Sequence, residues 1–124
     1  MKRKFIILIT SVIVTSICFI FNSMLLAKEF RKADTSRITR KWIDVPYGNT
    51  SSAQKLDIYL PERGDGPFPV IMSIHGGAFM GGDKGNGQLN PILKGLTAGY
   101  AVVGVNYRLS GEATFPAQIY DIKS

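Results

Sequence analysis

The segment of this chain best suited to chemistry is His75-Gly76-Gly77-Ala78-Phe79, which directly follows an apolar run at residues 70–74. Glycines allow the backbone to approach a ligand closely, and consecutive free N–H groups can point at one oxygen atom. Acyl transfer requires donors of this kind, because they stabilise the negative charge that develops on the reacting carbonyl oxygen.

The other parts of a hydrolytic site are missing from the sequence. No Gly-x-Ser-x-Gly occurs, and His75 is the single histidine of the chain. Without a base, a serine hydroxyl stays protonated and is a weak nucleophile. We therefore expect no catalytic nucleophile, acid or base in this chain, and only background ester turnover by the chain alone.

Other charged or glycine-rich segments are weaker candidates. Residues 81–87 suggest a phosphate-binding loop but lack its Gly-Lys-Ser/Thr ending and the GxGxxG spacing. We interpret Asp83 and Lys84 as loop-fixing or surface charges, Asp121 as a helix-surface or structural carboxylate, and Arg108 as a structural hydrogen-bonding residue. No cluster has metal-ligand spacing, so no metal and no cofactor is expected.

Two alternating segments precede the candidate loop. Residues 41–47 and 54–60 alternate apolar and polar side chains, and turn-forming residues separate them. This pattern predicts an antiparallel pair of half-buried strands, with Leu56, Ile58 and Leu60 on one face.

Two further segments, residues 70–74 and 101–107, are short, mostly apolar and β-branched. That composition predicts central strands covered on both faces. Between them, leucines and isoleucines recur at helical spacing up to Gly99, which suits a helix C-terminus. Strand, helix and strand form a βαβ unit, which is parallel and right-handed, so the predicted fold class is α/β.

The last residues begin another helix. Pro116 suits a first helical turn, and Phe115, Ile119 and Ile122 then share one face that has no partner in the sequence. Because so few core elements are present, we expect residues 41–124 to form an incomplete domain; a naturally short protein with a frayed C-terminus is the alternative.

The N-terminus has the pattern of a targeting segment. Three basic residues, 2–4, precede an uncharged apolar stretch, 5–27, which as a helix is long enough to span ~30 Å of hydrocarbon. We therefore expect residues 1–27 to be a signal peptide or a membrane anchor. Ala27 suits position −1 of a cleavage site and Leu25 suits position −3 poorly, which favours retention as an anchor. A buried core helix is the alternative.

The positive charge is concentrated beside this segment. Residues 28–41 carry six basic and two acidic residues, whereas residues 42–124 carry six basic and seven acidic ones. A basic groove for phosphates is therefore missing, which argues against nucleic-acid binding. Residues 28–40 are predicted to be a basic polar tether. Their charge would place the domain in the cytoplasm by the positive-inside rule, but the basic start favours a membrane-anchored domain outside the cytoplasm, or secretion.

Residues 42–124 resemble the esterases and lipases of the α/β-hydrolase fold, because His-Gly-Gly-small-Phe after a strand is similar to their HGGG-type loop. The branch near hormone-sensitive lipase and carboxylesterases, in particular the bacterial feruloyl and acetyl-xylan esterase type, is the most similar. The supporting motifs, in chain order, are LDIYLP (56–61), the loop itself, GGDK (81–84), YAVVGVNYRLS (100–110) and FPAQIYDIKS (115–124).

The resemblance implies that two of the backbone N–H groups of Gly76, Gly77 and Ala78 form an oxyanion hole, and that His75 shapes the loop. Many relatives have glycine where this chain has Ala78, but an alanine N–H still donates. The resemblance further implies that this chain is the N-terminal part of a serine hydrolase for small-molecule esters, with the nucleophile soon after the helix that begins near Pro116. A non-catalytic, membrane-anchored binding protein on a degenerate hydrolase scaffold is the alternative.

Overall fold

The computed structural model describes residues 13–23 and 31–124. The chain divides into two units, Met1–Arg31 and Lys32–Ser124. In the first unit, residues 13–23 are helical. Within the described ranges, no helix combines the length and apolar character that a membrane crossing needs. Much of the predicted signal or anchor segment, residues 5–27, lies outside the described residues.

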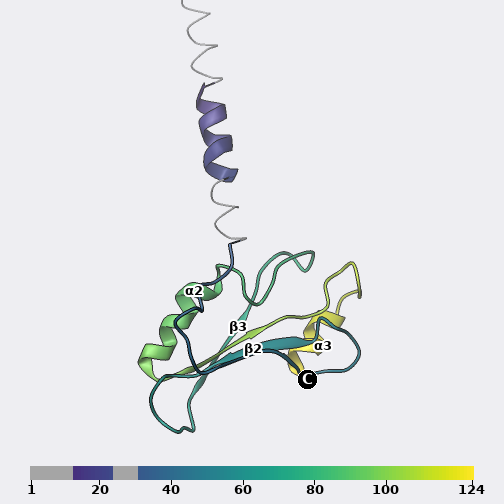
Figure 1. Cartoon of the computed structure of the whole chain (residues 1–124). Coiled ribbons are helices and arrows are strands. Elements are labelled where there is room, and N and C mark those ends of the chain that lie inside the picture. Colours follow the sequence, from purple (N-terminus) through teal and green to yellow (C-terminus); the bar gives the residue numbers. More distant parts are fainter. Residues whose placement is uncertain (1–12, 24–30) are drawn as a thin grey trace, which may run out of the picture. The chain divides into compact units, whose positions relative to one another are not determined.

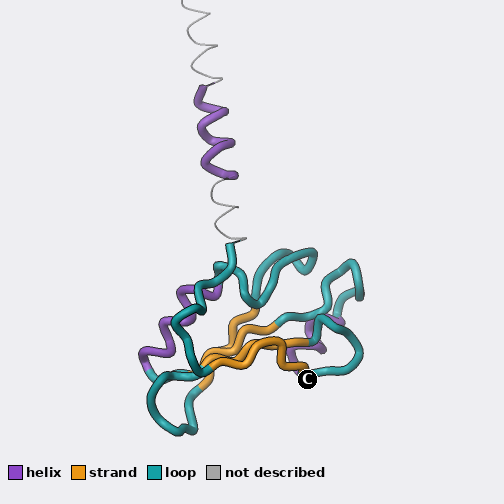
Figure 2. Tube along the Cα trace, in the orientation of Figure 1, coloured by secondary structure: helices purple, strands orange, loops and turns teal. Residues whose placement is uncertain are grey.

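The second unit is built on one mixed four-stranded sheet (Figures 1 and 2). Its strands are β1 (Lys41–Pro46), β2 (Lys55–Tyr59), β3 (Val70–Ile74) and β4 (Ala101–Val105). In the order β1-β2-β4-β3, the first two neighbouring pairs are antiparallel and β4 runs parallel to β3. The predicted α/β class, with an antiparallel pair followed by a βαβ unit, is confirmed.

The crossover between β3 and β4 consists of α2 (Leu89–Ile92) and the 3-10 helix η1 (Leu93–Ala98). Gly99 ends it with φ +84°, a left-handed conformation that glycine adopts without a steric penalty. Within η1, Gly95 allows a close approach to β3, because an added Cβ would lie 2.8 Å from Ile71 Cδ1. The helix predicted for this segment is confirmed, although its second half is the tighter 3-10 form.

The core lies between the sheet and this crossover. Tyr59, Leu89, Leu93 and Val102 form its buried cluster, and Ile38 is among the side chains packed against it. The sequence placed the start of the domain at residue 41, yet residues 32–40 already contact it. The Ala33 N–H donates to the Gly85 carbonyl at 2.8 Å, next to a bridge between Lys32 and Asn86.

The expectation that β3 is covered on both faces is wrong for this structure. Val70, Met72 and Ile74 are 60%, 52% and 51% exposed. They share one face, and among the described elements only α3 (Ala117–Lys123) reaches its end, where Ile74 lines a cavity with Ile119 and Ile122. β3 also lies at the edge of the sheet, with β4 as its one neighbour in the described chain.

The alternation predicted for β2 is confirmed, with Leu56, Ile58 and Leu60 on one face, but the opposite face is the more deeply buried one. Leu56, Ile58 and Leu60 are only half-buried, whereas Asp57 and Tyr59 on the other face are almost completely buried. The reason is that Tyr59 enters the core and Asp57 meets a buried lysine described below.

The final helix, α3 (Ala117–Lys123), begins directly after Pro116, as predicted. It lies at the end of the strands away from the crossover in the view of Figure 1. Asp121 is buried on it, so the interpretation of this residue as a helix-surface carboxylate is wrong, and the structural interpretation holds.

Candidate active site: the loop after strand β3

The candidate loop, residues 75–84, begins at the carboxyl end of β3, beside the end of the parallel strand β4. Ligands of open α/β sheets bind at this end of the strands. This position makes the loop a candidate ligand-binding site.

Positive φ angles characterise the centre of the loop. Gly77, Ala78 and Phe79 have φ values of +130°, +52° and +62°. The Gly77 carbonyl accepts hydrogen bonds from the N–H groups of Met80 at 2.9 Å and Gly81 at 3.1 Å, which closes a tight turn. Glycine is required at position 77, because an added Cβ would collide with the Gly81 carbonyl oxygen. This backbone stores strain that the surrounding contacts must hold.

The three N–H groups that the sequence singled out differ in their partners. Gly76 donates its N–H to the side-chain oxygen Oε1 of Gln88 at 3.0 Å. The N–H groups of Gly77 and Ala78 donate to no acceptor within the described part of the chain. Gln88 was not recognised from the sequence, since a polar residue at the start of a helix has many possible partners.

His75 lies at the base of the loop and is buried. Its ring stacks on Tyr107 with centroids 4.5 Å apart, and its Nδ1 lies 2.9 Å from the Gly76 carbonyl oxygen. Tyr107 also donates its hydroxyl to the His75 carbonyl at 2.9 Å, and burial raises the pKa of this tyrosine. Gly82 packs so closely on the ring that an added Cβ would lie 2.2 Å from Nδ1. The His75 ring is therefore packed between Tyr107 and the backbone of the loop.

An ion cluster around the buried Lys84 fixes the far end of the loop; Asp57 in it is buried and Asp44 is exposed. The Lys84 ammonium lies 2.8 Å from Asp44 Oδ1 and 3.1 Å from Asp57 Oδ1. Burial works against the charge of Lys84, but the hydrogen bonds and charges of the two carboxylates outweigh it and raise the pKa of the lysine. The hydrogen bond from Lys84 in turn lowers the pKa of Asp44. The loop-fixing interpretation of Lys84 agrees with this geometry, and the surface interpretation does not.

The neighbouring Asp83 joins the loop to the end of β4. Its Oδ2 accepts a hydrogen bond from Asn106 Nδ2 at 3.0 Å, and its Oδ1 accepts the N–H of Gly85 at 2.7 Å. Burial alone would raise the pKa of Asp83, but these hydrogen bonds and Lys84 hold it below the usual value. Asn106 also accepts the Lys84 N–H at 2.6 Å, so one side chain holds two successive loop residues.

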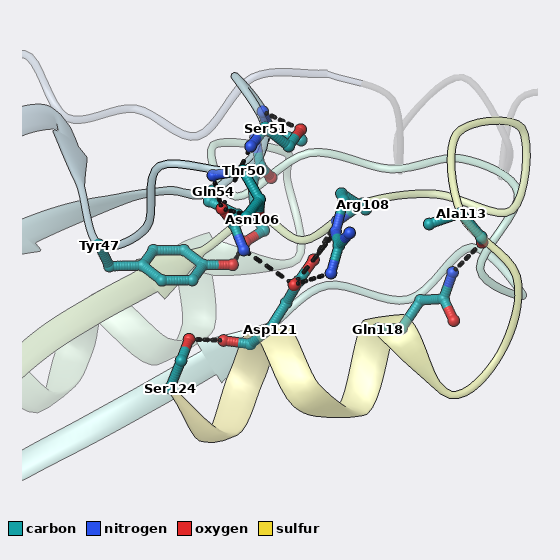
Figure 3. A network of polar contacts seen from close by, with 11 residues as sticks. Tyr47, Thr50, Ser51, Gln54, Asn106, Arg108, Ala113, Gln118, Asp121 and Ser124 are labelled. Atoms are coloured by element: carbon teal, nitrogen blue, oxygen red, sulfur yellow. Dashed lines mark hydrogen bonds and ion pairs between the residues drawn. The ribbon is translucent and has the colours of Figure 1, made fainter.

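A second polar network attaches α3 to the same end of the sheet (Figure 3). The carboxylate of Asp121 accepts a hydrogen bond from Arg108 Nη2 at 2.7 Å and from Gln54 Nε2 at 2.9 Å. The Arg108 hydrogen bonds are the main reason that the pKa of Asp121 is lowered. Nearby, burial raises the pKa of Tyr47 to about 12, and its hydroxyl donates to the Asn106 carbonyl. The predicted hydrogen-bonding role of Arg108 is confirmed.

Two cavities adjoin the loop. One, of about 350 Å³, is lined by Ala53, by three loop residues and by five residues after β4: His75, Met80, Gly82, Asn106, Tyr107, Leu109, Gly111 and Glu112. The other, of about 170 Å³, lies between the end of β3, Phe79 and the helix α3. Among the described residues, no group of His, Cys, Asp and Glu side chains is arranged to hold a metal ion.

The chain is similar to proteins of a known family and to solved structures. Residues 56–124 match the protein family described as BD-FAE. A relative from Mycobacterium tuberculosis, named probable carboxylic ester hydrolase LipM, is 39% identical over 83 residues, which cover 64% of this chain and 19% of the relative. The chain therefore spans about a fifth of the length of that protein.

Solved structures show the same architecture. A bifunctional GH43-CE protein from Bacteroides eggerthii has a TM-score of 0.54 at 39% identity, over 67% of this chain and 11% of that one. Esterase B from Lactobacillus rhamnosis has a TM-score of 0.61 at 23% identity, over 90% of this chain and 36% of that one. At that identity the second similarity establishes the fold alone.

Proposed function

Because this chain belongs to the BD-FAE family, we propose that it forms the oxyanion-hole portion of a longer hydrolase of carboxylic esters that acts by serine acyl-enzyme chemistry. One observation carries the proposal: two adjacent N–H groups, of Gly77 and Ala78, have no acceptor among the residues that the structure describes, and they lie in a strained turn at the carboxyl end of β3. Donors that are fixed before the reaction stabilise a developing oxyanion without a cost of reorganisation.

In this proposal Gly77 and Ala78 are the donors. Gly76 has a different role, because its N–H is engaged by Gln88 and its contact fixes the start of the turn. His75 shapes the loop and is not the catalytic base, since its ring is stacked on Tyr107 and its Nδ1 lies against the Gly76 carbonyl.

In this proposal the longer hydrolase, called the parent below, carries the nucleophile, its base and its acid in other parts of its chain. The fold places them in the chain order Ser, Asp or Glu, and His, with the serine in Gly-x-Ser-x-Gly, a motif that this sequence does not contain. The substrate is a small ester, and the residues here bind the carbonyl oxygen without a cofactor. The chain alone binds an oxyanion but does not form the acyl-enzyme.

We also propose an extracytoplasmic location, with residues 1–27 as a signal peptide or a membrane anchor. The basic start and the uncharged apolar stretch that follows support it. Fractionation of cells that express the parent would test this, because cytosolic recovery of a chain that retains residues 1–27 contradicts it.

The test of the function is an assay of p-nitrophenyl acetate hydrolysis by the parent protein. Gly77→Ala should lower kcat by about 10²–10³, because the added Cβ collides with the Gly81 carbonyl and displaces the donors. Lys94→Ala is the control, since Lys94 is exposed on the crossover and lines neither cavity beside the loop, and its activity should be unchanged. A parent without ester turnover contradicts the proposal, as does turnover at the level of an ordinary esterase by residues 1–124 alone.

A further inference from the structure

One nitrogen of the buried His75 ring has no partner among the described residues. His75 is 5% exposed, and its Nδ1 lies 2.9 Å from the Gly76 carbonyl oxygen. A carbonyl oxygen only accepts hydrogen bonds, so Nδ1 carries the proton of the neutral ring and donates to it. The other nitrogen, Nε2, is then an unprotonated acceptor. The contact with Gly76 therefore fixes the tautomer and leaves one acceptor unused.

This free nitrogen keeps contact with open space. Within the described residues, Gln118 Oε1 is the single side-chain oxygen or nitrogen that is sealed from solvent without a hydrogen bond. The Nε2 atom of His75 also lacks a partner there, so it is not sealed. The space that His75 lines is the cavity of about 350 Å³ beside the loop. We therefore place Nε2 on the wall of this cavity.

The polar side chains around the cavity favour a ligand that donates hydrogen bonds. The hydroxyl of Tyr107 donates to the His75 carbonyl, and the amide nitrogen of Asn106 donates to Asp83. The exposed carboxylate of Glu112 accepts no hydrogen bond within the described part of the chain. The side-chain acceptors that remain for a ligand are therefore His75 Nε2 and the Glu112 carboxylate.

The charge of the lining favours a cation. Glu112 is the one charged residue among those that line the cavity in the described chain. Arg108, whose charge interacts with that of Glu112, is itself hydrogen-bonded to Asp121 at 2.7 Å. An ammonium group brings three N–H donors and a positive charge, and its hydrogen bonds to a carboxylate are stronger than those of a neutral donor. Met80 and Leu109 offer apolar contact for a short carbon chain.

We propose that this cavity binds a small primary amine, whose ammonium group donates hydrogen bonds to His75 Nε2 and to the Glu112 carboxylate. All the residues that line the site lie between Ala53 and Glu112. The inference therefore depends neither on sequence outside this chain nor on the hydrolysis of esters.

The first test is the protonation of the imidazole, which can be observed directly because His75 is the single histidine of the chain. The full chain with 15N-labelled histidine is studied by NMR at pH 8, in zwitterionic nanodiscs that accommodate its apolar residues 5–27. We expect a proton on Nδ1 and none on Nε2. Addition of n-butylamine, which is protonated at this pH, should shift the Nε2 signal more than the Nδ1 signal. A proton on Nε2, or an Nε2 signal that butylamine leaves unchanged, would overturn the inference.

The second test compares three ligands with the same four-carbon body, namely n-butylamine, n-butanol and butyrate, by the shift of the same signal. Butylamine should bind about tenfold more tightly than butanol, because hydrogen bonds to charged groups are stronger, and butyrate should not bind. Equal affinities of butylamine and butanol would refute the ammonium group as the recognised feature, and so would tighter binding of butyrate.

The third test removes the charge of the cavity. Glu112→Gln keeps the shape of the side chain and should lower the affinity for butylamine about tenfold, to the level of butanol. Glu62→Gln is the matched control, since Glu62 is likewise exposed but does not line this cavity, and its affinity should be unchanged. Both side chains are exposed, so neither exchange should change the melting temperature. An equal loss of affinity in the two variants would mean that butylamine is attracted by surface charge in general, which contradicts a site in this cavity.

Discussion

The two parallel strands β3 and β4 have nearly the same kind of sequence and opposite surroundings. In β4, Val102 is completely buried, and Ala101 and Val105 on the other face are buried as well. In β3, every second side chain is more than half exposed. β4 has neighbours on both edges and the backbone of Lys84 over Gly104, whereas β3 has neither. Apolar strand composition therefore does not by itself determine how deeply a strand is buried in this structure.

The largest expected loss of stability comes from removing the ammonium group of Lys84, the residue whose backbone lies over β4 at Gly104. Lys84→Met leaves the buried Asp57 without its cation and should lower the free energy of unfolding by about 3–5 kcal/mol, measured by urea denaturation. The exposed Lys94→Met should change it by less than about 0.5 kcal/mol. Equal effects of the two substitutions would mean that the ion cluster does not fix the loop.

Two alanine substitutions, one in each strand, test the difference in burial between β3 and β4. Val102→Ala should cost about 2 kcal/mol, because it leaves a cavity in the core, whereas Met72→Ala in residues 1–124 should cost less than about 0.5 kcal/mol. In the parent the cost of Met72→Ala should rise towards that of Val102→Ala. A large cost of Met72→Ala in the shorter chain would show that β3 is already covered.

The acid sensitivity of the domain tests how α3 is attached. The pKa of Asp121 is lowered in the folded state by the Arg108 hydrogen bonds, so its stabilisation is present above the unfolded pKa near 3.8 and is lost as pH falls through the lower folded value. Asp121→Asn should cost about 1.5 kcal/mol at pH 7 and flatten the decline in stability below pH 4. Denaturation curves from pH 7 to pH 2.5 measure both; an unchanged acid decline contradicts the assignment.

The smallest effect concerns the strained turn between the two strands. Ala78→Gly should raise the free energy of unfolding by about 0.5–1 kcal/mol, because a φ of +52° is unfavourable for alanine. The same exchange at Ala98, inside η1, should lower it by a similar amount. Thermal unfolding compares the two, and destabilisation by Ala78→Gly would show that the turn is not strained.

Local patterns in the sequence predicted most of the fold. The strand at residues 70–74 was predicted with its observed bounds, and the crossover ends at Gly99 as expected, because alternation, apolar runs and terminal glycines act over a few residues. The exposure of β3 was not predictable, since it depends on which elements are present and not on the strand itself.

Of the candidate site, the sequence predicted the part that depends on local pattern and not the part that depends on contacts between distant residues. The loop was located by its glycines, but the pairing of Lys84 with Asp57 joins residues that are far apart in the sequence and brought together only by the sheet. Which of the three N–H groups are free to act as donors likewise depended on Gln88. The sequence does not show that this side chain, at the start of the crossover, accepts a hydrogen bond from Gly76.

The hydrogen bond between Gly76 and Gln88 belongs to a set of contacts that lie entirely within this chain. Together with Tyr107 and Gly81, Gln88 holds the turn of the candidate loop. We therefore expect the backbone of this turn to keep its conformation when sequence outside residues 32–124 is varied.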